Sequence, residues 1–185
     1  MLSQNLRCEY FHNPVGIEER FPRLSWILSS DGKNERQSAY QILCASSQQI
    51  LNDGKGDLWD TGKVASDESI HIAYEGESLR SRQQVWWKVK VWDSNGEESD
   101  WSDVSFWEMG LLERDDWKAE WIGADLRGGK WTTIPCPFLR REFSLKKPIA
   151  KARLYVTALG LVEVHLNGER VGDILFSPGW TDYRK

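Results

Sequence analysis

The 185-residue sequence lacks the features of several protein classes. Its three cysteines, at positions 8, 44 and 136, are odd in number and widely spaced, with no Cys-x-x-Cys pair. This spacing argues against a disulfide framework. Neither the cysteines nor His12, His71 and His165 have companions at metal-ligand spacing, so the sequence predicts no metal site and no cofactor.

Basic charge and long apolar runs are also scarce. Lysine and arginine number 24 against 28 acidic residues, and they are scattered, so we expect neither nucleic acid nor membrane as a partner. No run approaches the roughly 20 apolar residues of a membrane helix, and the first residues do not resemble a signal peptide. We therefore expect a cytoplasmic protein, which free cysteines also suit. Secretion is the alternative if a leader was removed from a longer precursor.

Helical periodicity is almost absent, and short alternating segments bounded by turn residues recur about every ten residues. The sequence therefore predicts an all-β fold. A hydrophobic content of 40% is sufficient for a packed core. In the first part of the chain the expected strands are residues 23–28, 39–46, 58–63, 69–73, 84–93 and 104–108.

The strand expected at residues 84–93 has two different faces. One face is apolar and the other alternates tryptophan with lysine. Because lysine stems can lie across indole rings while the ammonium stays wet, we expect a half-exposed ladder on the second face. The next residues, Asp93 to Gly96, contain an Asn-Gly signal for a tight hairpin turn.

A composition shift and adjacent acidic residues at 110–116 indicate a domain boundary. We predict a first β-sandwich at residues 1–112 and an incomplete, jelly-roll-like sandwich at residues 113–185. In the second, strands are expected at 138–145, 152–158, 161–166 and 170–175, with a type I′ turn at Asn167-Gly168. A sheet with so few strands has an open edge. We therefore expect a truncated module whose partner strand comes from further sequence or from another subunit.

Several segments resemble the start of the bacterial alpha-L-rhamnosidases. In the first module these are residues 22–26, 37–43, 58–64, 86–93, 101–102 and 107–110, which are also similar to a fibronectin type III module. In the second module, residues 152–156, 166–173 and 178–183 resemble that family's amino-terminal sandwich. The resemblance implies an enzyme that releases terminal L-rhamnose by inversion, with its carboxylates on a helical barrel that follows these modules.

The sequence itself offers no catalytic residues. Inverting glycosidases need two carboxyl groups about 6.5–9.5 Å apart across the sugar. The adjacent acidic pairs, at 18–19, 97–98 and 115–116, fall in turn-like segments, and neighbours on an extended chain point apart. We therefore expect an inactive accessory scaffold whose partner is the catalytic domain of the parent enzyme.

The eleven tryptophans are the feature most open to a binding role. Trp26, Trp59, Trp87 and Trp107 lie in strand patterns and are predicted to be core residues. Trp180 differs, because it follows a Pro-Gly turn and precedes Asp182 and Tyr183.

Three interpretations of the Trp180 segment stay open: sugar contact, packing against the catalytic domain, and local core. Two alternative functions follow for the whole chain. One is an independent carbohydrate-binding module that takes a rhamnose-containing glycan through Trp180 and Tyr183. The other is an interaction module that self-associates through the open sheet edge.

Overall fold

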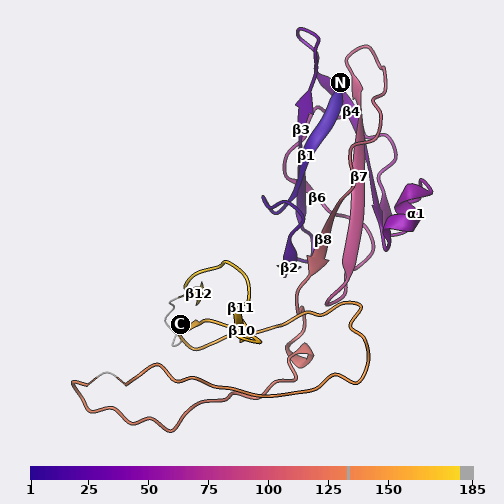
Figure 1. Cartoon of the computed structure of the whole chain (residues 1–185). Coiled ribbons are helices and arrows are strands. Elements are labelled where there is room, and N and C mark those ends of the chain that lie inside the picture. The colour runs from indigo at the N-terminus through magenta and orange to yellow at the C-terminus, as the bar shows by residue number, and fades with distance from the viewer. Residues whose placement is uncertain (133, 180–185) are drawn as a thin grey trace. The chain divides into compact units, whose positions relative to one another are not determined.

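The computed structural model describes residues 1–132 and 134–179. The chain divides into two compact units, Met1–Trp121 and Ile122–Lys185, which are described separately below (Figure 1). The boundary predicted at residues 112 and 113 stays a prediction; it lies just ahead of the short 3-10 helix η1 (Arg114–Asp116).

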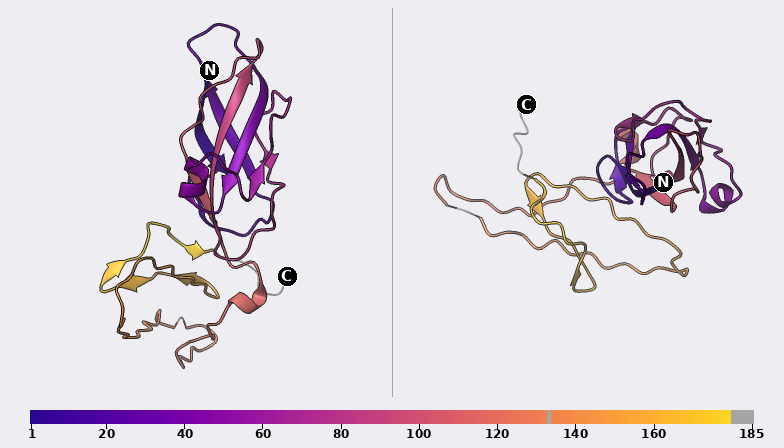
Figure 2. Two further views of the ribbon diagram at one scale, coloured as in Figure 1. Left: turned by 90° about the vertical axis from the view of Figure 1, so that its right-hand side faces the viewer. Right: turned by 90° about the horizontal axis from the view of Figure 1, so that it is seen from above.

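The first unit is a sandwich of two sheets (Figure 2). The three-stranded sheet has the order β1 (Leu2–Cys8), β3 (Arg23–Ser29), β6 (Ile72–Ala73). The five-stranded sheet has the order β2 (Val15–Ile17), β8 (Ser105–Met109), β7 (Gln84–Asp93), β4 (Gln37–Ala45), β5 (Trp59–Asp60). Neighbouring strands pair antiparallel except β2 and β8, which pair parallel. The all-β prediction is confirmed.

The core lies between the two sheets and is rich in aromatic rings. Trp26, Trp87 and Trp107 are at most 2% exposed, which confirms them as core residues, and the partly buried Trp59 packs against this core. Tyr74 meets Trp59 and Trp107 edge to face, with ring centroids 5.3 and 5.7 Å apart. Such pairs contribute about 1 kcal/mol each beyond the area that they bury.

The three cysteines lie in contrasting environments. Cys8 and Cys44 are free thiols buried in this core, whereas Cys136 is exposed in the second unit. Burial raises the pKa of both core thiols, because an apolar environment disfavours the thiolate.

The outer face of the five-stranded sheet is covered. Helix α1 (Gln48–Asn52), capped by the Ser47 hydroxyl, inserts Leu51 against Leu43 of β4. Lys88 of β7 donates from Nζ to the Leu51 carbonyl at 2.9 Å, and its ammonium lies 4.9 Å from the centroid of the Trp101 ring. The expected lysine–indole contacts are thus confirmed, but Lys88 is buried rather than half-exposed because α1 lies over it.

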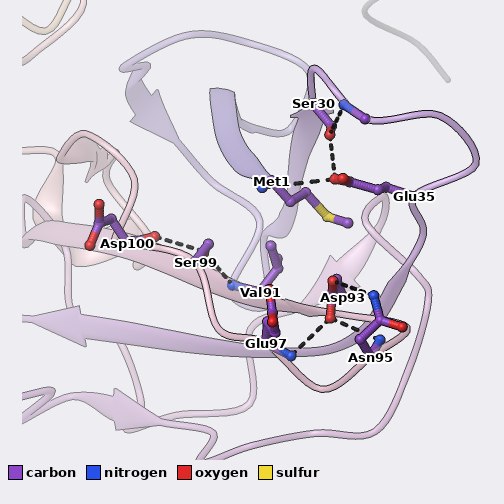
Figure 3. A network of polar contacts seen from close by, with 10 residues as sticks. Met1, Ser30, Glu35, Val91, Asp93, Asn95, Glu97, Ser99 and Asp100 are labelled. Atoms are coloured by element: carbon purple, nitrogen blue, oxygen red, sulfur yellow. Dashed lines mark hydrogen bonds and ion pairs between the residues drawn. The ribbon is translucent and has the colours of Figure 1, made fainter.

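The turn after β7 is tied by the Asp93 carboxylate (Figure 3). Its Oδ1 accepts hydrogen bonds from the backbone N–H groups of Asn95 and Glu97, at 2.9 and 2.8 Å. These bonds favour the ionised form and hold the pKa of Asp93 below its usual value. Gly96 supplies the positive φ of 84° that this tight hairpin turn requires, so the predicted turn is confirmed.

A second polar network lies at the same end of the first unit (Figure 3). The amino group of Met1 lies 3.9 Å from the Glu35 carboxylate, which also accepts a hydrogen bond from the Ser30 hydroxyl. These contacts attach the start of β1 to the loop between β3 and β4.

In residues 122–132 and 134–179 the second unit forms two short antiparallel strand pairs. Strand β9 (Leu161–Val162) pairs with β12 (Ser177–Pro178), and β10 (His165–Leu166) pairs with β11 (Glu169–Arg170). The last pair is joined by Asn167 and Gly168, with φ values of 53° and 88°, which confirms the predicted type I′ hairpin.

Two predicted strands of this unit are not formed. Residues 138–145 and 152–158 carry no strand, and the segment predicted at 170–175 is reduced to the two residues of β11. Alternation of apolar residues shows which side chains share a face, but a strand also needs a backbone partner, and the described residues supply none. Apolar side chains of these segments are consequently exposed, among them Phe138 and Phe143.

Candidate functional site

The predicted contact residues Trp180, Asp182 and Tyr183 lie outside the described residues. The structure describes the chain as far as Gly179, where Ser177 of β12 pairs with Val162 of β9. The three interpretations of the Trp180 segment therefore stay predictions.

The adjacent acidic residues, to which the sequence assigns no catalytic role, form hydrogen bonds and ion pairs within the first unit. The Asp116 carboxylate accepts hydrogen bonds from the Ser81 hydroxyl and from the backbone N–H of Glu113, which together lower the pKa of Asp116. Glu98 pairs with Lys90 at 3.1 Å. These contacts close turns and tie strands.

Neither a metal site nor a membrane segment is found in the described parts of the chain. Within residues 1–132 and 134–179, no group of three or more His, Cys, Asp and Glu side chains is placed to hold a metal ion. Over the same residues, every helix is too short or too polar to cross a bilayer.

A polar row crosses the outer face of the three-stranded sheet. Arg7 of β1 lies opposite Ser25 of β3, and the backbone N–H of His71 donates to the Ser25 hydroxyl at 3.2 Å. The neighbouring residues Leu24 and Ile72 point into the core and are buried. Strand alternation therefore places Arg7, Ser25 and His71 together on the outside.

A strained turn rises beside this row. Cys8 and Phe11 exchange two backbone hydrogen bonds of 3.0 Å, and the two residues between them, Glu9 and Tyr10, have φ values of 48° and 70°. Two positive φ values in a two-residue hairpin define a type I′ turn, which favours Asn-Gly. Left-handed backbone costs residues with a Cβ about 1–2 kcal/mol each. Glu9 and Tyr10 therefore hold this turn only because other contacts compensate.

The Glu9 side chain supplies the first compensation. Its Oε1 accepts from the Arg23 backbone N–H at 2.6 Å and from Arg23 Nε at 3.1 Å, and its Oε2 accepts from Nη2 at 2.6 Å. These bonds to Arg23 hold the pKa of Glu9 below its ordinary value.

The Tyr10 side chain makes the second set of contacts that compensate for the strained turn. Its hydroxyl lies 2.7 Å from His71 Nε2, the two rings meet edge to face, and the Arg23 guanidinium lies 5.3 Å from the Tyr10 centroid. Tyr10 is thus fixed in place although 57% of it is exposed.

Arg7 differs from Arg23 in its hydrogen-bond partners, which are uncharged. Its Nη1 donates to the Tyr10 carbonyl and its Nε to the Asn5 side chain, both at 3.4 Å. In the part of the chain that the structure describes, it makes no ion pair, whereas Arg23 is neutralised by Glu9. Three exposed apolar residues come from the same segments: Phe11 follows Tyr10, Ile70 precedes His71, and Ile27 lies two residues after Ser25 on β3.

We call Arg7, Tyr10, Ser25 and His71, together with the Glu9–Arg23 pair, the Tyr10 cluster. Sequence reasoning missed it. Its members come from three separate segments, and Glu-Tyr is not a turn signature. Only the strand register brings them together.

The chain matches two known domain families. Residues 3–113 match the Rha78A-like, N-terminal immunoglobulin domain, and residues 147–185 match the alpha-L-rhamnosidase N-terminal domain. An alpha-L-rhamnosidase of Formosa agariphila is 44% identical over 183 residues, which cover 96% of this chain and 20% of the relative.

Solved structures agree with these matches. The alpha-L-rhamnosidase from Dictyoglumus thermophilum superposes with a TM-score of 0.65 at 44% identity, over 66% of this chain and 14% of that one. The enzyme from Aspergillus terreus gives a TM-score of 0.70 at 26% identity and covers 99% of this chain and 20% of that one. The chain thus spans about one fifth of the length of the curated relatives that it matches.

Proposed function

The chain belongs to the alpha-L-rhamnosidase family, and from this membership we propose that it acts as the non-catalytic amino-terminal accessory region of such an enzyme. The observation that carries the proposal is the extent of the match: 96% of this chain aligns with only 20% of a rhamnosidase. The accessory region would position a catalytic barrel carried by the longer polypeptide and shape one edge of its substrate cleft.

The acidic residues of the first unit are consistent with a non-catalytic role for this chain. Hydrolysis with inversion needs a protonated carboxyl and a carboxylate on opposite sides of the sugar. Asp93, Asp116 and Glu9 are the acidic residues of the first unit whose pKa values are lowered, so each favours the ionised form and none is suited to act as the general acid. In this proposal the release of terminal L-rhamnose is the task of the barrel.

Localisation in the cytoplasm is part of the proposal. Cys8 and Cys44 are free, buried thiols, which is the usual state of cysteine in a reducing compartment.

The test is turnover of an aryl alpha-L-rhamnoside. The purified chain is expected to show none. An F. agariphila rhamnosidase lacking the fifth of its length that matches this chain is expected to lose thermal stability, and to regain it when the chain is added. Turnover by the chain alone would contradict the proposal, as would full stability of the shortened enzyme.

Narrower proposals concern the glycan and self-association. Contact between Trp180 or Tyr183 and sugar predicts that millimolar L-rhamnose changes tryptophan fluorescence, and that Trp180→Ala abolishes the change. Pairing through the sheet edge of the second unit predicts a mass that rises with concentration in light scattering. A flat fluorescence titration and a constant monomer mass would reject these two proposals respectively.

A further inference from the structure

We infer that the outer face of the three-stranded sheet, centred on the Tyr10 cluster, is a docking surface for the catalytic portion of the rhamnosidase, and that this partner presents a carboxylate to Arg7. The inference rests on the proposed function and adds to it a location and a chemistry for the contact.

The first argument is the contrast between the two outer faces of the sandwich. Helix α1 and Trp101 cover the face of the five-stranded sheet and bury Leu43 and Leu51 there. On the three-stranded sheet, Ile27 of β3 and Ile70 beside β6 are 52% and 63% exposed. Exposed apolar side chains next to polar ones on one face of a domain are a feature of protein interaction sites.

The second argument is the strained turn. The backbone of Glu9 and Tyr10 is left-handed, and contacts with Arg23 and His71 hold it so. Their combined effect is to present one exposed aromatic ring in a fixed orientation. Strain of this kind is concentrated at functional sites, and a preordered tyrosine loses little entropy when a partner packs on it.

The third argument identifies the chemistry of the partner. Glu9 already neutralises Arg23, whereas Arg7 hydrogen-bonds to neutral groups, the Asn5 side chain and the Tyr10 carbonyl, and has no acidic partner among the described residues. Tyrosine and arginine are enriched among the residues that contribute most to interface energetics, and the complement of a guanidinium is a carboxylate. The partner surface is therefore expected to place an Asp or Glu beside an apolar patch.

The length of the relatives identifies the occupant. Four fifths of a rhamnosidase lie outside the region that this chain matches, so a surface large enough to cover the Tyr10 cluster is available in the same enzyme. A stable contact of this kind needs about 800 Å² on each partner.

The experiment measures the affinity of the chain for the shortened F. agariphila rhamnosidase by biolayer interferometry. The variants are Arg7→Glu, which reverses the unpaired charge, and Tyr10→Ala, which removes the ring. Lys55→Gln is the matched control, because Lys55 is exposed just after α1 on the covered side. Thermal unfolding of every variant reports whether the first unit is folded.

We expect Arg7→Glu and Tyr10→Ala to weaken binding by about tenfold or more, with Lys55→Gln unchanged. Binding of the wild-type chain that neither variant weakens would overturn the docking surface and leave the proposed function intact. A wild-type chain that does not bind at all would overturn both. If Tyr10→Ala unfolds the turn, the exposed Arg7→Glu variant decides the result.

Discussion

The hairpin turns at Glu9-Tyr10 and Asn167-Gly168 share a backbone conformation but not a cause. Both have two residues with positive φ between antiparallel segments. Asn-Gly adopts that conformation by its own preference, so the turn in the second unit is encoded locally. Glu-Tyr adopts it only with the help of Arg23 and His71, so the turn in the first unit is a product of the tertiary fold. The same geometry can therefore mark a local signal in one place and a strained, supported surface in another.

Exchanging the residues of the two turns should give the largest effect. Asn167→Glu combined with Gly168→Tyr puts unfavourable residues into a turn for which the described residues show no counterpart of the Arg23 and His71 contacts. The cost is about 1–2 kcal/mol for each residue. We expect the β10–β11 hairpin to open, seen as loss of hydrogen-exchange protection at the Val171 amide, which bonds to Val164. Asn167→Asp, which keeps a favourable Asp-Gly turn, is the control. Retained protection in the double variant would show that this turn too is held by tertiary contacts.

Removing the Glu9 charge should have the next largest effect. Glu9→Gln keeps the size of the side chain but loses the charge-assisted bonds to Arg23, so the first unit should unfold roughly 2–5 °C lower. Glu75→Gln, at an exposed position, provides the comparison in calorimetry. Equal melting temperatures would mean that the turn does not need the Arg23 contact.

Acid should abolish the difference in unfolding free energy between the wild-type chain and the Glu9→Gln variant. Hydrogen bonds from Arg23 lower the pKa of Glu9 from its ordinary value of 4.5, so the folded state binds a proton less readily than the unfolded chain. The resulting stability is present above pH 4.5 and is lost as the pH falls through the lower, folded-state pKa. Denaturant unfolding between pH 7 and pH 3 should show the two stability curves converging. A stability difference that stays constant with pH would mean that Glu9 stabilises the first unit by packing rather than by its charge.

Tyr10→Phe should have the smallest effect. It keeps the ring over Arg23 and removes only the hydroxyl that lies 2.7 Å from His71 Nε2. Because both groups are exposed, we expect a loss of stability of about 0.5 kcal/mol or less. The sensitive measurement is the NMR shift of the His71 ring, which should change while the backbone spectrum of the first unit is preserved. An unchanged His71 signal would exclude the contact in solution.

The sequence predicts a strand best where alternation is unbroken. Strand β7 was predicted with the bounds that the structure gives, because its apolar face repeats every second residue. Strand β1 was missed because the pairing with β3 shifts register between Gln4 and Arg7, and Asn5 has a positive φ of 52°. The bulge changes the parity of the buried positions from Ser3 to Leu6, so no regular alternation is visible in the sequence.

The Tyr10 cluster could not be predicted for a related reason. Arg7 and Ser25 become neighbours through a register that the bulge sets, and His71 joins them from a third segment. Pairings between distant segments depend on how the whole sandwich assembles, which local residue patterns do not report. The Trp180 segment shows the opposite limit: a clear local pattern whose residues lie outside the described structure.

The contrast among the three cysteines should allow a thiol reagent to label the native chain at a single site. Cys136 is exposed, whereas Cys8 and Cys44 are shielded inside the first unit and their thiolates are disfavoured. A maleimide dye should therefore attach to one thiol per native molecule, within the second unit. Uptake of two further equivalents would then time the opening of the first sandwich, so a mass spectrum could follow its unfolding without any engineered label.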